Sequence, residues 1–205
     1  FADGVRAVRR RGELMFEAGV ERPGTMAALL GLDDAAVAAV CGDVEKGICV
    51  PANFNSEGQV VISGDEAGVA EGIERAKAAG AKKTVPLHVS GAFHSPLMES
   101  AEAGLAEFLE GIDFRDPVVP VVSNVTAEPV RDGAAARELL VRQLTSPVLW
   151  SRSIAYMLEA GVDRFVEIGP GKVLCGLNRR NAKGYPCASL GTVEQVRSYI
   201  EGVEQ

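Results

Sequence analysis

The sequence has few of the residues that mark several protein classes. Only 5% of its 205 residues are aromatic, and one is tryptophan. No run of about 18 apolar residues, the length that a membrane-spanning helix needs, is present, and no signal peptide is visible. The four cysteines form no CxxC pair and no metal-ligand spacing; they are Cys41, Cys49, Cys175 and Cys187. We therefore expect a cytoplasmic protein with free thiols, no metal and no membrane contact.

Charge of one sign is in excess. Lysine and arginine number 21 and aspartate and glutamate 28, which gives a net charge of −7. An acidic surface repels nucleic acid, and the sequence lacks the aromatic motif of RNA-binding sheets. Hydrophobic residues make up 47% of the chain, which is typical of a soluble globular protein. We expect a monomer that binds no nucleic acid, although the net charge does not exclude a local basic pocket for an anionic substrate.

Residues 24–89 contain a diffuse internal repeat. "MAALLGLDDAAVAAV" predicts a strand, a glycine, an acidic cap at Asp33 or Asp34 and a helix, and "QVVISGDEAGVAEGI" repeats that order with a cap at Asp65. "ICVPANFN" between them and "KKTVPLHV" after them read as further strands. The order β-α-β-β-α-β predicts a ferredoxin-like subdomain over residues 24–89.

The flanking residues alternate between helix and strand. Helices are predicted over 96–110, 133–144 and 150–160, a buried strand in "VVPVVSN", a strand in "DRFVEIG", and helices from "KVLCGLNRR" and "VEQVRSYIEGV". This alternation predicts a mainly parallel sheet with helices on its faces. The fold class is therefore α/β, with residues 1–23 and 90–205 forming a core that the subdomain of residues 24–89 interrupts.

His94 is a candidate general base, because it follows an apolar strand and opens a helix in "VSGAFHSPLM". His88 has no comparable setting and is expected to be structural. No serine or cysteine has glycine at both flanking positions of the G-x-S-x-G elbow. Either His94 is not a base, or its nucleophile lies upstream of Phe1, where the sequence begins within a predicted helix.

That first helix carries a candidate anion site. Its predicted apolar stripe comprises Val5, Val8, Gly12, Met15 and Phe16. In the run Arg9–Arg11, Arg11 lies within about 40° of Met15 and Arg9 borders the stripe near Phe16, so the helical period does not choose between them. An arginine at a pocket edge can hold a carboxylate through two parallel hydrogen bonds.

Several segments together resemble the malonyl-CoA:acyl-carrier-protein transacylases, an acyltransferase family. They are "RRGELM", "VPANFNSEGQVVISG", "VPLHVSGAFHSPLM", "VPVVSNVTAEPV", "LVRQLTSPVLWSRSIAYML" and "EIGPGKVLCGLNRR". The resemblance implies an α/β-hydrolase-like core with an inserted ferredoxin-like subdomain. It also implies transfer of malonyl from coenzyme A to the phosphopantetheine thiol of acyl carrier protein in fatty acid synthesis, with no cofactor besides the coenzyme A thioester as substrate.

The resemblance also implies roles for particular residues. His94 matches the base, and Gln143 matches the residue whose main-chain carbonyl orients it. Substrate-binding positions are matched by Arg11, which would pair with the malonyl carboxylate, and by Met15, Asn55 and Phe93. The family's serine elbow and G-Q-G loop, from its N-terminal third, are absent, so we expect no nucleophile in this chain and no catalysis by it alone.

The sequence also admits other functions. The chain could be a non-catalytic remnant that binds the carrier protein, or a hydrolase in which water replaces the carrier thiol. An acyltransferase domain of a polyketide synthase is a close relative, although no linker is apparent at the C-terminal end.

Overall fold

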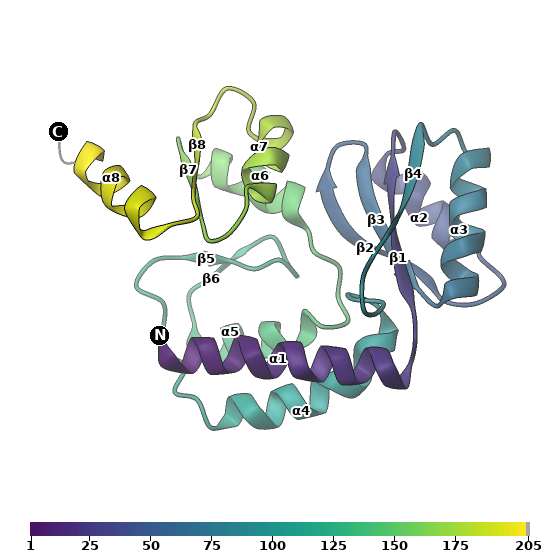
Figure 1. Ribbon diagram of the computed structural model, residues 1–205, viewed down its shortest axis with the longest axis horizontal. Coiled ribbons are helices and arrows are strands. Elements are labelled where there is room, and N and C mark those ends of the chain that lie inside the picture. The colour runs from purple at the N-terminus through teal and green to yellow at the C-terminus, as the bar shows by residue number, and fades with distance from the viewer. Residues whose placement is uncertain (204–205) are drawn as a thin grey trace. The chain divides into compact units, whose positions relative to one another are not determined.

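Two capped helices alternate with four strands in the part of the chain between Thr25 and Leu87 (Figure 1). The computed structural model describes residues 1–203. The elements are β1 (Thr25–Leu30), α2 (Asp34–Gly42), β2 (Cys49–Ser56), β3 (Gln59–Gly64), α3 (Glu66–Ala78) and β4 (Lys83–Leu87). Asp33 and Asp65 cap the two helices by accepting hydrogen bonds from the main-chain N–H groups of Ala36 and Gly68. The strands and helices predicted for this part are present, in the predicted order.

These strands form one antiparallel sheet in the order β2-β3-β1-β4. One face packs against α2 and α3 through a core that includes Leu29, Val37 and Ile62. The opposite face carries Met26, Ala52 and Val61, and Phe93 packs against them. Because strand residues alternate between faces, this second face supports the segment that leads to His94.

Three helices of residues 1–153 pack on one another rather than on the sheet face that α2 and α3 cover. α1 (Ala2–Glu21) contacts α4 (Glu99–Glu110), which the short 3₁₀ helix η1 (Pro96–Met98) precedes, and α5 (Gly133–Arg142) also contacts α4 (Figure 1). Their shared core contains Leu14, Met15, Leu105 and Leu144. Among the helices described, none is long and apolar enough to cross a membrane.

The buried face of α1 differs from the predicted stripe. Val5, Val8 and Phe16 are exposed, whereas Leu14, Met15, Ala18 and Gly19 are buried. Both faces carry apolar side chains, so the sequence period identifies a helix without selecting a face. Packing on α4 makes that selection.

The segment "VVPVVSN" is not the buried strand that its apolar residues predict. Only β5 (Val121–Val122) forms, and it pairs antiparallel with β6 (Pro129–Val130). Val118, Val119 and Val121 are exposed. In the described residues 1–203, the segment joins no sheet other than this two-residue pair, so no layer buries its side chains.

The chain divides into two compact units, one ending at Ser153 and the other beginning at Ile154. α6 (Trp150–Glu159) spans that division, and β7 (Phe165–Ile168), α7 (Val173–Asn181), β8 (Cys187–Leu190) and α8 (Val193–Val203) follow. β7 and β8 pair in parallel. Outside residues 24–89 the only other sheet of the described residues is the two-residue antiparallel pair β5–β6, so the mainly parallel sheet expected for the flanking residues stays a prediction.

A disulfide in the second unit corrects another prediction. Cys175 of α7 and Cys187 of β8 are bonded, with their Cα atoms 5.6 Å apart, so the cysteines are not all free. The helix and strand bring the two residues together across a sequence separation of 12, which no sequence motif signals. Cys41 and Cys49 are free thiols, both buried.

Candidate active site

His94 lies between β4 and η1 in a conformation that few residues other than glycine adopt. Its φ is 58°, and among the described non-glycine residues only Ala127 shares a positive φ. Such backbone strain costs roughly 1–3 kcal/mol and persists only where the surroundings enforce it. Buried Ser95 enforces it here, since its hydroxyl donates to the Ala92 carbonyl at 2.6 Å and accepts from the Leu97 N–H at 3.2 Å.

The His94 ring is oriented by the end of α5. Its Nδ1 atom lies 2.9 Å from the main-chain carbonyl oxygen of Gln143, the residue that caps α5. The last carbonyls of a helix lack intrahelical partners and can accept such a bond. Because a carbonyl only accepts, Nδ1 carries the proton and Nε2 of the neutral ring is left as the basic nitrogen.

The surroundings of His94 favour its neutral form. Burial lowers the pKa of the imidazole, and the positive charge of Arg11 lowers it further. Hydrogen bonds with the main chain at Gln143 and Ser146 act in the opposite direction, without overcoming the effect of burial. A histidine with a lowered pKa is neutral near pH 7, which is the form that removes a proton.

Arg11 reaches the same residue as His94. Its Nη2 atom donates to the side-chain oxygen Oε1 of Gln143 at 3.2 Å. Its Nε is buried and has no hydrogen-bond acceptor in the described chain. Burial lowers the pKa of the guanidinium, but arginine remains a cation at neutral pH. The cluster thus contains a positive charge with an unused donor.

The choice between Arg9 and Arg11, which the helical period left open, is made by these contacts. Arg9 points to solvent and pairs with Glu13, its Nε lying 2.9 Å from Oε1. Arg10 lies near both Glu13 and Glu17. Only Arg11 of the three contacts Gln143 in the described structure.

The remaining candidate residues lie on α1, in β2 and in the segment after β4. Met15 is buried one turn along α1 from Arg11. Phe93 packs against the sheet face and also against the helical core. Asn55 is half-buried in β2, at one of its register shifts. His88 is exposed just beyond β4 and takes no part in the cluster.

The segment after Gln143 is joined to the strand of Asn55. Val148 donates to the Ala52 carbonyl at 2.8 Å, and its own carbonyl accepts from the Phe54 N–H at 2.9 Å. The connection between α5 and α6 is therefore fixed to β2. Sequence reasoning missed this connection and also Ser95, although a serine followed by proline at a helix start is a recognisable cap.

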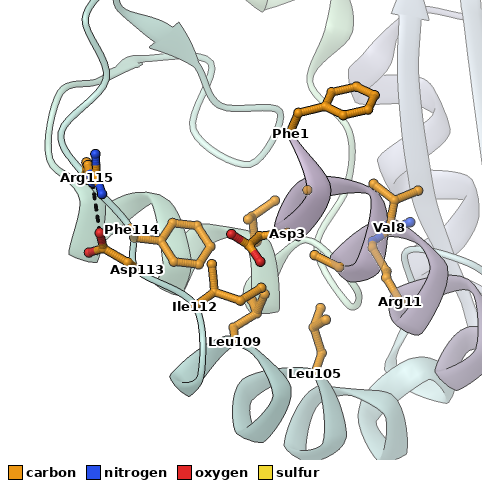
Figure 2. Close-up of a pocket in the computed structure, with 13 residues that line it drawn as sticks. Phe1, Asp3, Val8, Arg11, Leu105, Leu109, Ile112, Asp113, Phe114 and Arg115 are labelled. Carbon is orange, nitrogen blue, oxygen red and sulfur yellow. Dashed lines mark hydrogen bonds and ion pairs between the residues drawn. The ribbon is translucent and has the colours of Figure 1, made fainter.

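A separate pocket of about 400 Å³ opens beside Arg11 (Figure 2). It lies between the first half of α1, the end of α4 and the segment after it, and Leu105, Leu109, Ile112 and Phe114 give it apolar walls. Figure 2 shows Arg11 toward one end and the Asp113–Arg115 ion pair toward the other. Neither His94 nor Gln143 lines it. The described residues contain no group of three or more potential metal ligands.

The described chain is a mixed α/β structure in which an oriented histidine and a half-buried arginine both contact Gln143. The chain belongs to the acyl transferase domain family, whose model matches residues 1–199.

Several curated relatives and solved structures are similar to the chain. The malonyl CoA-acyl carrier protein transacylase of Escherichia coli K12 is 49% identical over 202 residues, which are 98% of this chain and 65% of the relative. The protein of that name from Staphylococcus aureus MSSA476 is 41% identical over 98% of this chain and 66% of its own length. The chain therefore spans just under two thirds of these relatives.

Among solved structures, the malonyl-CoA:acyl carrier protein transacylase of Xanthomonas oryzae pv. oryzae superposes with a TM-score of 0.90 at 40% identity, covering 98% of this chain and 64% of the other. A malonyl-transacylase in complex with a type II polyketide synthase acyl-carrier protein gives 0.89 at 40% identity, covering 97% and 64%. The mixed α/β fold of the described residues is that of these proteins.

Proposed function

We propose that the protein transfers a malonyl group from coenzyme A to the phosphopantetheine thiol of acyl carrier protein, in fatty acid synthesis in the cytoplasm. The observation that supports it best is the shared contact at Gln143, whose carbonyl faces the His94 Nδ1 atom and whose side chain accepts from Arg11. A proton acceptor and a cation for an acidic acyl group then stand at one site. The activities named for the relatives are consistent with this proposal.

In this mechanism Nε2 of His94 removes the proton of an attacking hydroxyl. The oxygen bonds to the thioester carbonyl carbon, the carbon–sulfur bond breaks, and the protonated histidine returns its proton to the departing coenzyme A thiolate. The carrier thiol then gives its proton to His94 and attacks the acyl carbonyl carbon. The carbon–oxygen bond breaks, and His94 returns the proton to that oxygen, which restores the hydroxyl. The Gln143 carbonyl acts as the orienting third member, because it fixes the tautomer in both steps.

The attacking hydroxyl is proposed to be a serine outside these 205 residues. No serine or cysteine of the chain lies in the glycine-flanked elbow that presents a nucleophile. About one third of each relative is also not matched by the chain. The 205-residue chain by itself is expected to transfer no malonyl group.

Arg11 is proposed to pair with the free carboxylate of the malonyl group. Its buried Nε has no acceptor in the described residues, and a carboxylate oxygen is a suitable one. Met15 and Phe93 would form the walls beside the acyl group, and Asn55 would be a polar contact.

We propose that residues 1–23 and 90–205 belong to an α/β-hydrolase-like core and that residues 24–89 are a ferredoxin-like subdomain inserted in it. The strand order β2-β3-β1-β4, with α2 and α3 packed on one face, supports the subdomain. Figure 1 shows these two helices next to the sheet.

The nature of the carrier is a second question. The solved complex with a type II polyketide synthase carrier makes a polyketide carrier the alternative to a fatty acid carrier. Comparing transfer rates to purified carriers of both kinds would decide between them. Tight carrier binding without transfer by the full-length protein would instead favour a non-catalytic carrier-binding protein.

The test of the proposed function is the acyl preference of an Arg11→Ala variant of the full-length protein. Loss of the cation leaves the malonyl carboxylate unpaired in the site, at a cost of about 2–5 kcal/mol, whereas acetyl carries no such charge. The ratio of kcat/KM for malonyl-CoA to that for acetyl-CoA should fall, and Arg11→Lys should restore it in part. Arg9→Ala is the matched control on the same helix. An unchanged ratio in Arg11→Ala would exclude this residue from substrate recognition.

A further inference from the structure

We infer that the side-chain amide of Gln143 is a positioning group for Arg11, so that one residue orients both the base and the cation of the site. This inference rests on the proposed function and extends it, since the role assigned above to Gln143 concerns its main-chain carbonyl. The two contacts leave from different atoms: the carbonyl oxygen lies 2.9 Å from Nδ1 of His94, and Oε1 accepts from Nη2 of Arg11 at 3.2 Å.

Gln143 is held firmly enough to orient two partners. It caps α5 in a helical conformation, and its N–H donates to the Leu139 carbonyl at 3.0 Å. The next residue, Leu144, is completely buried in the helical core and anchors the turn. The peptide that carries the base-orienting carbonyl and the side chain that meets Arg11 are thus fixed by the same packing.

The amide suits its contact with Arg11 because it is neutral. Arginine only donates hydrogen bonds, so the amide oxygen, and not its nitrogen, faces Nη2. No carboxylate of the described residues lies within ion-pair distance of Arg11, unlike Arg9 and Arg10 on the same helix. The contact therefore positions the guanidinium without neutralising it, and the charge stays available for an anionic acyl group.

The Arg11 guanidinium retains a donor for that acyl group. With Nη2 occupied by Gln143, the buried Nε remains without an acceptor in residues 1–203. A buried donor without a partner is costly unless a ligand satisfies it. The amide of Gln143 thus holds the guanidinium at Nη2 and leaves the Nε donor for a ligand carboxylate.

Three substitutions at position 143 separate this role from the orienting of His94, because all keep the main-chain carbonyl. Gln143→Ala removes the amide and should lower the malonyl-to-acetyl ratio of kcat/KM roughly 10- to 150-fold, as expected for a hydrogen bond to a charged group. Most of the loss should appear in KM for malonyl-CoA. Gln143→Glu should lower the ratio further, since a carboxylate would neutralise Arg11. Gln143→Asn should fall between the parent and alanine.

A double-mutant cycle in the full-length protein tests the link directly. If Gln143 acts through Arg11, the ratio for Arg11→Ala with Gln143→Ala should equal that for Arg11→Ala alone. Additive losses, or a Gln143→Glu variant with the parent's ratio, would overturn the inference. The neighbouring exposed residue Arg142 provides the control, since Arg142→Ala should leave the ratio unchanged.

A binding measurement keeps this inference distinct from the proposed function. The ¹⁵N–¹H signal of the Arg11 Nε is followed while sodium malonate, or sodium acetate as the comparison, is added to parent and Gln143→Ala protein. The parent signal should shift with malonate and the variant should need a higher concentration. If malonyl transfer is absent but this difference is found, only the proposed function fails; equal malonate affinities would refute the positioning role.

Discussion

At the scale of single residues, His94 combines a strained backbone with a buried ring. Its positive φ turns the ring toward the end of α5, where the Gln143 carbonyl orients it. Its sequence position at a helix start made it a candidate base. The tautomer and the contact with Gln143 depend on a residue 49 positions away and could not be read from that position. The same holds for Arg11, which the helical period could not separate from Arg9.

The pKa of His94 gives the first prediction at this scale. Burial and the charge of Arg11 lower it, so the ring should titrate below the ordinary histidine range, and Arg11→Ala should move the pKa upward. Arg11→Lys should keep it low, because the charge remains. The measurement is a ¹H NMR titration of the imidazole C–H signals, with a His88→Gln variant to assign the two rings. A midpoint for His94 within or above the ordinary histidine range would contradict the prediction.

The lowered pKa of His94 also determines how its contribution to folding stability changes with pH. A histidine whose pKa is lower in the folded state than in the unfolded chain binds its proton more readily after unfolding. The contribution of His94 to stability is therefore intact above the unfolded pKa and is lost as the pH falls toward the folded one. In transfer assays with the full-length protein, the acidic limb of the kcat/KM profile should follow the same lowered pKa.

At the scale of elements, local sequence patterns predicted which helices and strands form better than they predicted which faces of them are buried. The caps at Asp33 and Asp65 and the alternation of strand and helix between them are local signals, and the structure has them. The buried face of α1 is not local, since it depends on the contact with α4, and the predicted stripe through Val5, Val8 and Phe16 is exposed. The predicted burial of Val118 and Val119 is wrong for a related reason, because an apolar run is buried only where another layer covers it.

Two glycines of α1 give a matched prediction at this scale. A Cβ on Gly19 would clash with the carbonyl oxygen of Ser90, which belongs to the segment that leads to His94. Neither backbone can move cheaply, so Gly19→Ala should destabilise by roughly 1–3 kcal/mol. At Gly12 a Cβ would meet nothing within 4 Å, and Gly12→Ala should stabilise by about 1 kcal/mol through helix propensity.

Urea unfolding followed by fluorescence can compare the two variants, because the only tryptophan, Trp150, lies in the first unit. Gly19→Ala should also shift the imidazole signals of His94, while Gly12→Ala should not. Equal unfolding midpoints for both variants would mean that α1 does not pack closely on residues 90–91 in solution.

At the scale of the whole molecule, the protein consists of two compact units with different means of stabilisation. The first has a continuous apolar core on one sheet face and a second core among its helices. The second unit contains the parallel pair β7–β8, with α7 between them in the chain, and the Cys175–Cys187 disulfide. Sequence alone indicated free thiols, because spacing and composition carry no sign of a pairing that only the approach of α7 to β8 creates.

The second unit should therefore respond to reduction of its disulfide, and the first unit should not. The disulfide closes a short loop, and such a cross-link stabilises by about 2–4 kcal/mol, chiefly by restricting the unfolded chain. Reduction, or Cys175→Ser, should therefore speed amide hydrogen exchange in residues 165–190 and leave the sheet of the first unit unaffected, with unchanged Trp150 fluorescence. Alkylation in denaturant should label Cys41 and Cys49 before reduction and all four cysteines after it. Cys41→Ala is the control, since it removes one labelled thiol and keeps the disulfide. Labelling of all four thiols without reductant would show that α7 and β8 are held by packing alone, and exchange in the second unit should then be insensitive to reducing agents.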